Sequence, residues 1–403
     1  MGLLKKISFL SSSVFSRLVI GSILVFVFAR TLGPEGYGQI VVATTISSIC
    51  IVLIDCGYQT FIVKEVSGDE AGIPNSYSNA IQVKALLAPL YIIVVFCVNY
   101  AFFENQNPNE LIFIAISVYL LSMGDFFNIA FRVVDMYSLE AKNILIGAIL
   151  NLIVVGSTCL FFKSIYQVSL SMMIARLMYL YVCYNQFYNR FGTINISFSI
   201  NNVVHQIKRV KLYALDQANV VFRSNVDVLI IGALLGNHNV GLYQAGMTLG
   251  KSFEKLAIIV ANIFLVELSK PKNFFFQNCK KLISIQALIG GLIFFIFLIL
   301  DEFIVLLLYG ESFYELISLM WLFGLFIFLR FMASSFGVIL TALNKQKIRV
   351  IIGIGSTLLS IPLMLVLVSD FAVYGAIVSQ IAINVVVLLL FFIFVYVYYR
   401  VKL

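Results

Sequence analysis

Charged residues are scarce in this chain of 403 residues, where Asp, Glu, Lys and Arg together make up 11%. A soluble protein carries about 25% charged residues, so the composition excludes an ordinary soluble domain. Hydrophobic residues make up 61% of the sequence, and its mean hydropathy is +1.02. The chain is therefore predicted to be an all-α, polytopic membrane protein.

The sequence also lacks the residue groupings on which metal sites, disulfide frameworks and phosphate-binding loops depend. Its six cysteines form no CxxC pair, and its two histidines, His205 and His238, stand in predicted loops. It contains no Walker-type glycine loop and no nucleophile motif. We therefore expect no metal, no cofactor and no enzyme active site. Energy is expected from an H+ or Na+ gradient or from the substrate's own gradient, not from ATP.

Apolar segments long enough to cross a bilayer recur along the whole chain. A membrane-spanning helix needs about 20 such residues, and about twelve spans are predicted, at residues 7–29, 38–62, 80–103, 110–131, 144–163, 165–188, 212–235, 240–266, 282–300, 316–341, 347–368 and 372–399. Lys and Arg concentrate in alternate loops, and the opposite loops are short and acidic. By the positive-inside rule both termini are cytoplasmic. The net charge of +8 thus indicates orientation and not a nucleic-acid partner.

One polar loop, residues 189–211, divides the predicted spans into two sets of six. We expect an N-terminal lobe at 1–188, a cytoplasmic linker at 189–211 and a C-terminal lobe at 212–403. Similar glycine turns follow the first and seventh spans, which favours a tandem repeat with both halves in the same orientation. The basic end of the linker, HQIKRVK, would lie either on anionic lipid headgroups or in solvent, and solvent is the simpler interpretation.

The seventh and eighth predicted spans carry more charge than helices surrounded by lipid tolerate. Polar residues recur on one face of each span at helical spacing: Asp216, Asn219, Arg223 and Asp227 on the seventh, and Gln244, Lys251, Lys255 and Asn262 on the eighth, with Glu254 beside them. A charge at the bilayer centre costs about 2.5–3.5 kcal/mol. These faces are therefore predicted to line a polar cavity inside a helix bundle.

Three stretches carry a resemblance to a known family: VFVFARTLGPEGYGQI at residues 25–40, DVLIIGALLGNHNVGLYQAG at 227–246 and LLLYGESFYELI at 306–317. The sequence resembles the polysaccharide repeat-unit flippases, the O-antigen and capsule translocases of the multidrug/oligosaccharidyl-lipid/polysaccharide exporter superfamily. The resemblance implies a MATE-like fold, with two six-helix lobes around a central cavity. It also implies that an oligosaccharide linked to undecaprenyl diphosphate moves from the cytoplasmic to the outer leaflet.

The same resemblance implies a place for the protein in the cell. It would lie in the bacterial cytoplasmic (inner) membrane and act in the synthesis of O-antigen lipopolysaccharide or another surface polysaccharide. Its partners would be the lipid-diphosphate-linked oligosaccharide, membrane lipid, and the polysaccharide polymerase with its chain-length machinery. No nucleic acid is expected as a partner.

Basic residues near the middle of predicted spans suit an anionic substrate. A diphosphate needs charge-assisted donors, and Arg supplies two in parallel. The predicted substrate-binding cations are Arg17, Arg176, Arg223, Lys251, Lys255 and Arg330. No acid stands at helical spacing from Arg17, Arg176 or Arg330, so each of these three needs a partner on another helix or on the substrate. Lys84, near the cytoplasmic end of its span, is expected to extend toward the headgroups.

The acids in the predicted spans admit two roles, in ion pairs or in ion coupling. The candidates are Asp55, Asp125, Asp216, Asp227 and Glu254. Helical spacing allows a pair between Arg223 and Asp227, and another between Glu254 and Lys251 or Lys255. Asp55 and Asp125 have no partner along the sequence, and would either neutralise an arginine or carry a coupling proton.

Two other functions remain open at the level of the sequence. A multidrug or cation antiporter on the same fold would need an acidic cavity, whereas the cations here are in excess. A polysaccharide polymerase or ligase would usually need a long outer loop with catalytic polar residues, and the predicted outer loops are short.

Overall fold

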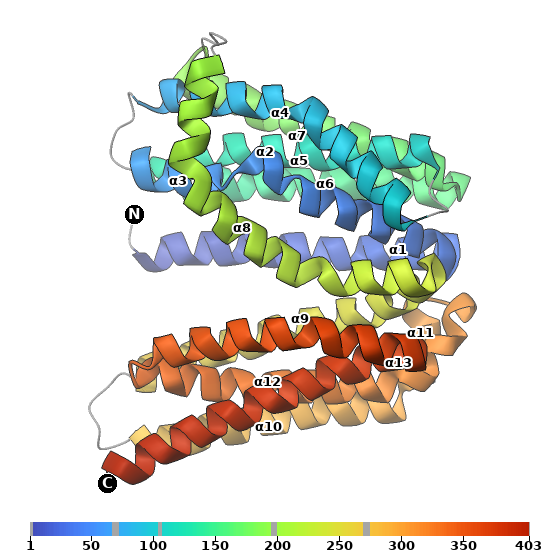
Figure 1. Cartoon of the computed structure of the whole chain (residues 1–403), viewed down its shortest axis with the longest axis vertical. Coiled ribbons are helices and arrows are strands. Elements are labelled where there is room, and N and C mark those ends of the chain that lie inside the picture. Colours follow the sequence, from blue (N-terminus) through green and yellow to red (C-terminus); the bar gives the residue numbers. More distant parts are fainter. Residues whose placement is uncertain (1–2, 67–71, 104–106, 195–199, 269–274, 403) are drawn as a thin grey trace. The chain divides into compact units, whose positions relative to one another are not determined.

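The computed structural model describes residues 3–66, 72–103, 107–194, 200–268 and 275–402, and within these ranges every regular element is helical. The chain forms two compact units, Met1–Leu229 and Ile230–Leu403, which we describe separately. The first unit contains α1 (Leu3–Cys50), α2 (Val52–Asp55), α3 (Tyr58–Val66), α4 (Ile73–Phe102), α5 (Pro108–Val133), α6 (Tyr137–Phe162), α7 (Ile165–Phe191) and most of α8 (Ile200–Leu235) (Figure 1).

Helix α1 holds the first predicted span and most of the second, joined at a break. Gly33 has φ 69° and ψ 179°, a conformation that glycine adopts without the cost of a Cβ. Pro34 follows, and a proline fits the first turn of a new helix because its missing N–H has no acceptor there. The glycine turn found in the sequence is therefore a sharp helix break.

The second predicted span, 38–62, is not one continuous helix, so this prediction was wrong in detail. The chain leaves α1 at Cys50, forms the short α2, and resumes as α3 at Tyr58. Cys56 (φ 46°) and Gly57 (φ 70°) are both left-handed, which ends the α-helical hydrogen bonding. A Cβ on Gly57 would lie 2.5 Å from the backbone carbon of Tyr213 in α8, so only glycine fits this close approach.

Aromatic side chains fill the core of the first unit. The ring centroids of Tyr77 and Phe126 are 4.5 Å apart, and those of Tyr77 and Phe187 are 4.7 Å apart. The hydroxyl of Tyr77 donates to the carbonyl of Phe126 at 2.8 Å, so the polar end of this buried ring is satisfied. The core joins α3, α4, α5 and α7 to the start of α8.

The predicted loop at 189–211 is largely helical in its described residues, 189–194 and 200–211. Helix α7 continues to Phe191 and α8 begins at Ile200. Val203 and Val210, two turns apart, pack into the aromatic core, while Lys208 and Lys211 are exposed. Residues 200–211 are therefore the amphipathic start of α8, whose polar composition made it resemble a linker.

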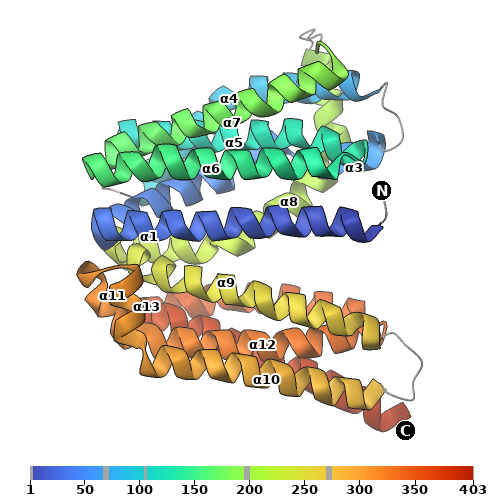
Figure 2. The same ribbon diagram turned by 180° about the vertical axis from the view of Figure 1, so that it is seen from behind.

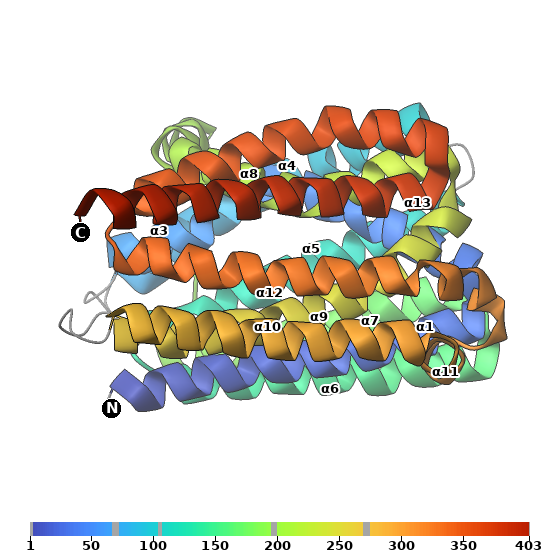
Figure 3. The ribbon, with the colours of Figure 1, turned by 90° about the horizontal axis from the view of Figure 1, so that it is seen from below.

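The second unit contains the end of α8, followed by α9 (Asn237–Leu268), α10 (Phe275–Ile299), α11 (Asp301–Leu308), the 3-10 helix η2 (Glu311–Leu319), α12 (Met320–Ala342) and α13 (Gln346–Lys402). Helix α13 holds the last two predicted spans and breaks at Ala372 (φ 51°, ψ −135°). Its two arms run back along each other (Figure 3). Figure 2 shows α10 beside α12 in this unit, and α6 beside α1 in the first unit.

The helices of both units have the length and surface of membrane spans. Nine helical segments in the described ranges are long and apolar enough to cross a bilayer. Two of the nine, Ser16–Val66 and Gln346–Val397, hold two predicted spans each, so they account for eleven of the predicted spans. Helix α9, of 32 residues, is long enough to be the twelfth. Large apolar side chains such as Phe161 (83%) and Leu288 (71%) are exposed, as on a surface surrounded by lipid.

Candidate functional site

In the first unit, Arg17 has its partner on another helix. Its guanidinium donates to both carboxylate oxygens of Asp125 in α5, from Nη2 to Oδ1 at 2.9 Å and from Nη1 to Oδ2 at 3.3 Å. The hydroxyl of Tyr179 in α7 donates to Asp125 Oδ1 at 2.8 Å. This bidentate ion pair fixes both side chains between α1, α5 and α7. Asp125 therefore neutralises an arginine, one of the two roles open to it.

Arg176 adds a second positive charge to this group. Its Nη1 donates to the hydroxyl of Ser117 in α5 at 3.0 Å, and it interacts electrostatically with both Arg17 and Asp125. Two guanidinium groups thus stand against one carboxylate. We call Arg17, Arg176 and Asp125 the first cluster, and its net charge is +1.

In the second unit, Arg330 joins three helices. It forms an ion pair with Glu254 of α9, and its Nη1 donates to Asn384 Oδ1 in α13 at 3.3 Å. Glu254 therefore pairs with an arginine of α12 and not with the lysines of its own helix. The side chains of Arg330 and Glu254 are 33% and 21% exposed, so the pair is partly shielded from its surroundings.

Lys251 and Lys255 lie one turn apart on α9, on either side of Glu254 in sequence, and interact electrostatically. Within the described ranges neither lysine has a hydrogen bond or an ion-pair partner. We call Lys251, Lys255, Arg330 and Glu254 the second cluster. Three cations against one carboxylate give it a net charge of +2.

The polar face of α8 is not held together by the predicted pair. Arg223 is exposed and, in the part of the chain that the structure describes, forms no ion pair with Asp227 or any other acid. Asp227 Oδ1 accepts a hydrogen bond from the N–H of Val228 at 3.0 Å. Asp216 is exposed as well. Arg223 is thus a further cation open to a ligand.

Lys84 does not extend to the headgroups, so that prediction was wrong. The side chain is fully buried, and its Nζ lies 2.6 Å from Asp55 Oδ1 and 4.8 Å from the centre of the Phe126 ring. Ser122 donates a further hydrogen bond to Asp55 Oδ1. Asp55 is therefore held inside the first unit and belongs to neither cluster.

The ion pair between Asp55 and Lys84 could have been predicted from the positions of the two residues in the sequence. Asp55 lies 11 residues before the end of α3 at Val66, and Lys84 lies 11 residues after the start of α4 at Ile73. Two neighbouring spans that run in opposite directions bring residues equally far from their connection to the same depth. A carboxylate and an ammonium at equal depth in a membrane stabilise each other when they pair, because burying either charge alone is unfavourable.

A glutamine of α8 completes the group around the helix break. Gln217 Oε1 accepts from the N–H of Gly57 at 2.8 Å, and its Nε2 lies 3.5 Å from Asp55 Oδ2. The break leaves the Gly57 N–H without a helical acceptor, and Gln217 supplies one. Helix α8 is thereby fixed to the second span of its own unit.

Comparison with solved structures identifies this architecture as that of a multi-pass transporter. The chain is similar to "Lipid II flippase MurJ, inward closed conformation", with 15% identity, 96% of this chain and 87% of that chain covered, and a TM-score of 0.72. It is also similar to an inward-facing multidrug resistance MATE family transporter of the MOP superfamily, with 13% identity, 95% and 96% coverage, and a TM-score of 0.67. A MOP superfamily transporter from Pyrococcus furiosus matches at 13% identity, with 97% and 94% coverage and a TM-score of 0.54.

The chain belongs to the polysaccharide biosynthesis protein family, whose profile matches residues 3–262. No curated protein matches the sequence. The predicted MATE-like fold is confirmed by the solved structures. The protein is thus a multi-pass membrane protein of the polysaccharide biosynthesis family with a MATE-like fold.

Proposed function

We propose that this protein is a flippase that moves an oligosaccharide linked to undecaprenyl diphosphate from the cytoplasmic to the outer leaflet of a bacterial inner membrane. The oligosaccharide is the repeat unit of a surface polysaccharide such as O-antigen. Transport proceeds by alternating access, driven by an H+ or Na+ gradient or by the substrate gradient. A polymerase and its chain-length machinery receive the product.

The observation that carries this proposal is the surplus of cations in both units. The first cluster has a net charge of +1 and the second a net charge of +2, and Arg223, which has no ion-pair partner among the described residues, adds one more cation. Each carboxylate within the clusters already has an arginine partner. Placing such charges inside a membrane is energetically unfavourable. Binding an anionic diphosphate headgroup would offset this free-energy cost.

The unpaired cations are assigned to the diphosphate. Arg223, Lys251 and Lys255 can each donate to phosphate oxygens without first breaking an ion pair. Arg17 and Arg330 are held by Asp125 and Glu254, so they position the clusters and contribute their charge at longer range. Neutral polar groups nearby, such as Asn384 beside Arg330, suit the hydroxyl and amide groups of sugars.

The same observation weighs against cation antiport, which the fold alone would permit. An antiporter for cationic drugs needs acids that are open to the ligand. Here Asp125 and Glu254 are paired with arginines and Asp55 is paired with Lys84. The candidates for ion coupling on α8 are Asp216, which is exposed, and Asp227, whose Oδ1 accepts from the N–H of Val228.

The decisive experiment is a lipid analysis of cells that lack the gene. Undecaprenyl-linked oligosaccharides are extracted, and the leaflet that they face is tested with a sugar-modifying reagent that does not cross the membrane. We expect complete repeat units to accumulate on the cytoplasmic face. Units that reach the outer face but stay unpolymerised would instead indicate a polymerase or ligase. Unchanged lipid-linked sugars would refute the flippase proposal and make the multidrug or cation antiporter the function to test next.

Complementation of that strain then tests the site. Arg223→Ala and Lys255→Ala should abolish surface polysaccharide while the protein level in the membrane stays unchanged. Lys281→Ala, which removes an exposed cation at the start of α10, is the matched control and should support normal synthesis. Normal polysaccharide in both site variants would refute the assignment of these cations.

A further inference from the structure

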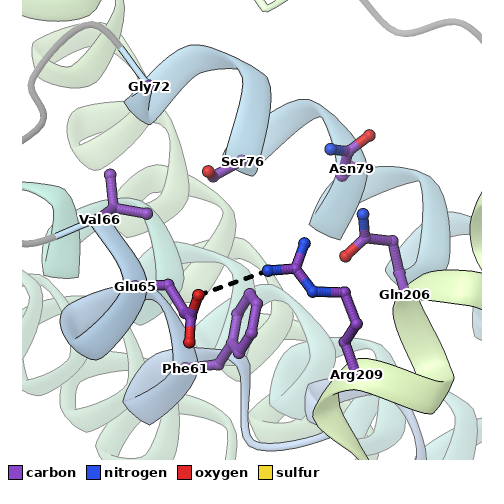
Figure 4. Close-up of a pocket in the computed structure, with 8 residues that line it drawn as sticks. All are labelled: Phe61, Glu65, Val66, Gly72, Ser76, Asn79, Gln206 and Arg209. Atoms are coloured by element: carbon purple, nitrogen blue, oxygen red, sulfur yellow. Dashed lines mark hydrogen bonds and ion pairs between the residues drawn. The ribbon is translucent and has the colours of Figure 1, made fainter.

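A polar cavity of about 130 Å³ lies in the first unit, where α3 ends and α4 and α8 begin (Figure 4). One water needs only about 10–15 Å³ of such space, so the cavity has room for a larger polar group. Its wall includes Glu65, Gly72, Ser76, Asn79, Gln206 and Arg209. None of these residues belongs to the first or second cluster, so the cavity is separate from the proposed transport site.

One side of the cavity is suited to an anion. Helix α4 has 30 residues, and no side chain caps its first turn, where the N–H of Ser76 donates to the carbonyl of Gly72 at 3.1 Å and Pro74 has no N–H. The positive end of this helix therefore meets the cavity at Gly72 and Ser76. Arg209 adds a guanidinium, which stacks 5.2 Å from the centre of the Phe61 ring.

Gln206 is a second feature of the cavity that is suited to a polar ligand. The residue is only 6% exposed, and in the described part of the chain its amide has no hydrogen-bond partner. In Figure 4 the amide points into the cavity beside Asn79 and the Arg209 guanidinium. Because the amide faces the cavity, its N–H groups can donate to the oxygens of a ligand held there.

The opposite side of the cavity carries a carboxylate. Glu65 Oε2 lies 3.4 Å from Arg209 Nη2, a long ion pair in which the two side chains are 41% and 45% exposed. Such a pair is weak and leaves Glu65 with acceptor capacity. A group that binds here meets donors on one side and an acceptor on the other, which is the pattern for a zwitterion.

The surface around the cavity has the mixed composition of a membrane interface. The first turns of α8 are amphipathic, with Val203 and Val210 in the core and Lys208 exposed. Val204 and Leu212 of the same helix are 47% and 70% exposed, so apolar groups lie beside the basic ones. This mixture fits the boundary between headgroups and acyl chains.

We propose that this cavity binds the headgroup of phosphatidylethanolamine. The phosphate accepts hydrogen bonds from Arg209 and the Gln206 amide beside the positive end of α4, and the primary ammonium donates to Glu65. Phosphatidylcholine lacks an ammonium N–H, and phosphatidylglycerol lacks the positive charge, so each fits only one side of the cavity. The lipid fixes the amphipathic start of α8 to α3 and α4.

The test uses the purified full chain in detergent, stripped of lipid and then mixed with phosphatidylethanolamine, phosphatidylcholine or phosphatidylglycerol. Native mass spectrometry measures how much of each lipid stays bound. We expect phosphatidylethanolamine to bind about 10-fold more tightly than phosphatidylcholine, the effect of one hydrogen bond to a charged group. Equal binding of all three lipids, or tighter binding of phosphatidylglycerol, would overturn the proposal.

Variants locate the site and separate it from general surface charge. Glu65→Gln should remove the preference for phosphatidylethanolamine over phosphatidylglycerol, and Arg209→Gln and Gln206→Leu should weaken phosphatidylethanolamine binding about 10-fold. Lys208→Gln, an exposed cation next to Arg209 that does not line the cavity, is the control and should bind like the wild type. A loss in Lys208→Gln equal to that in Arg209→Gln would refute the site. The melting temperature of each lipid-free variant shows that it is folded.

Discussion

Lys84 Nζ lies 2.6 Å from Asp55 Oδ1, and the lysine side chain is completely buried in the first unit. The pair bridges the two sides of a helix connection, because Asp55 ends α2 and Lys84 lies in α4. Charges so deeply buried in an apolar bundle persist only as a pair. Their role is structural, since they hold the broken second span against α4 and, through Gln217, against α8.

Lys84→Met should destabilise the protein by about 3–5 kcal/mol, because it leaves the Asp55 carboxylate buried without its cation. The double variant Asp55→Asn with Lys84→Met should recover most of this loss, since no unpaired charge remains. Thermal unfolding in detergent measures both. The exposed pair of Arg209 and Glu65 is the control, and breaking it with Glu65→Gln should cost less than about 1 kcal/mol. Equal costs at the two pairs would contradict the role given to burial.

Gly57→Ala should also destabilise the first unit. The left-handed φ of 70° costs a non-glycine residue about 1–2 kcal/mol, and the new Cβ would lie 2.6 Å from the carbonyl oxygen of Tyr213. Gly291→Ala is the matched control, because that glycine lies inside α10 with nothing within 4 Å of an added Cβ. The control should stabilise its helix by about 0.5–1 kcal/mol. The opposite order of melting temperatures would show that α8 does not dock on the break as described.

Features that depend on local sequence patterns, such as spans and turns, could be predicted from the sequence. The spans follow from runs of apolar residues, and the turn at Gly33 follows from a glycine before a proline. The break between α2 and α3 was missed because Cys56 and Gly57 stand in an uninterrupted apolar segment, and the reason for the break is the approach of Tyr213, more than 150 residues later.

The cations of the site could be listed from the sequence, but their partners could not. Arg17 and Asp125 are 108 residues apart, and Arg330 and Asn384 are 54 apart. Such pairs depend on which helices pack together and at which depth. Helical spacing instead suggested Arg223 with Asp227 and Glu254 with a neighbouring lysine, and the structure forms neither pair.

The stability of the first unit should depend on the charge of the residue at position 217 and not only on the hydrogen bonds of Gln217. Gln217→Leu removes the acceptor for the Gly57 N–H and the donor to Asp55, which should cost about 1–3 kcal/mol. Gln217→Glu keeps the acceptor but places a second carboxylate beside Asp55, so we expect it to be the more destabilising variant. Hydrogen exchange at the Gly57 amide measures the effect locally. Slower or unchanged exchange in both variants would mean that Gln217 does not hold the break.

Glu254→Gln should strengthen binding of undecaprenyl diphosphate by the purified protein. The substitution removes the carboxylate of the second cluster and raises its net charge from +2 to +3. It also breaks the ion pair with Arg330, so the variant should unfold at a lower temperature than the wild type. The gain in affinity should shrink as salt is added, because ions screen the extra charge. Glu315→Gln removes an exposed acid in the same unit, paired with His238, and is the control that should leave affinity unchanged. Weaker binding in Glu254→Gln would show instead that the carboxylate is needed to hold Arg330 in a binding position, and the surplus of charge would no longer explain the site.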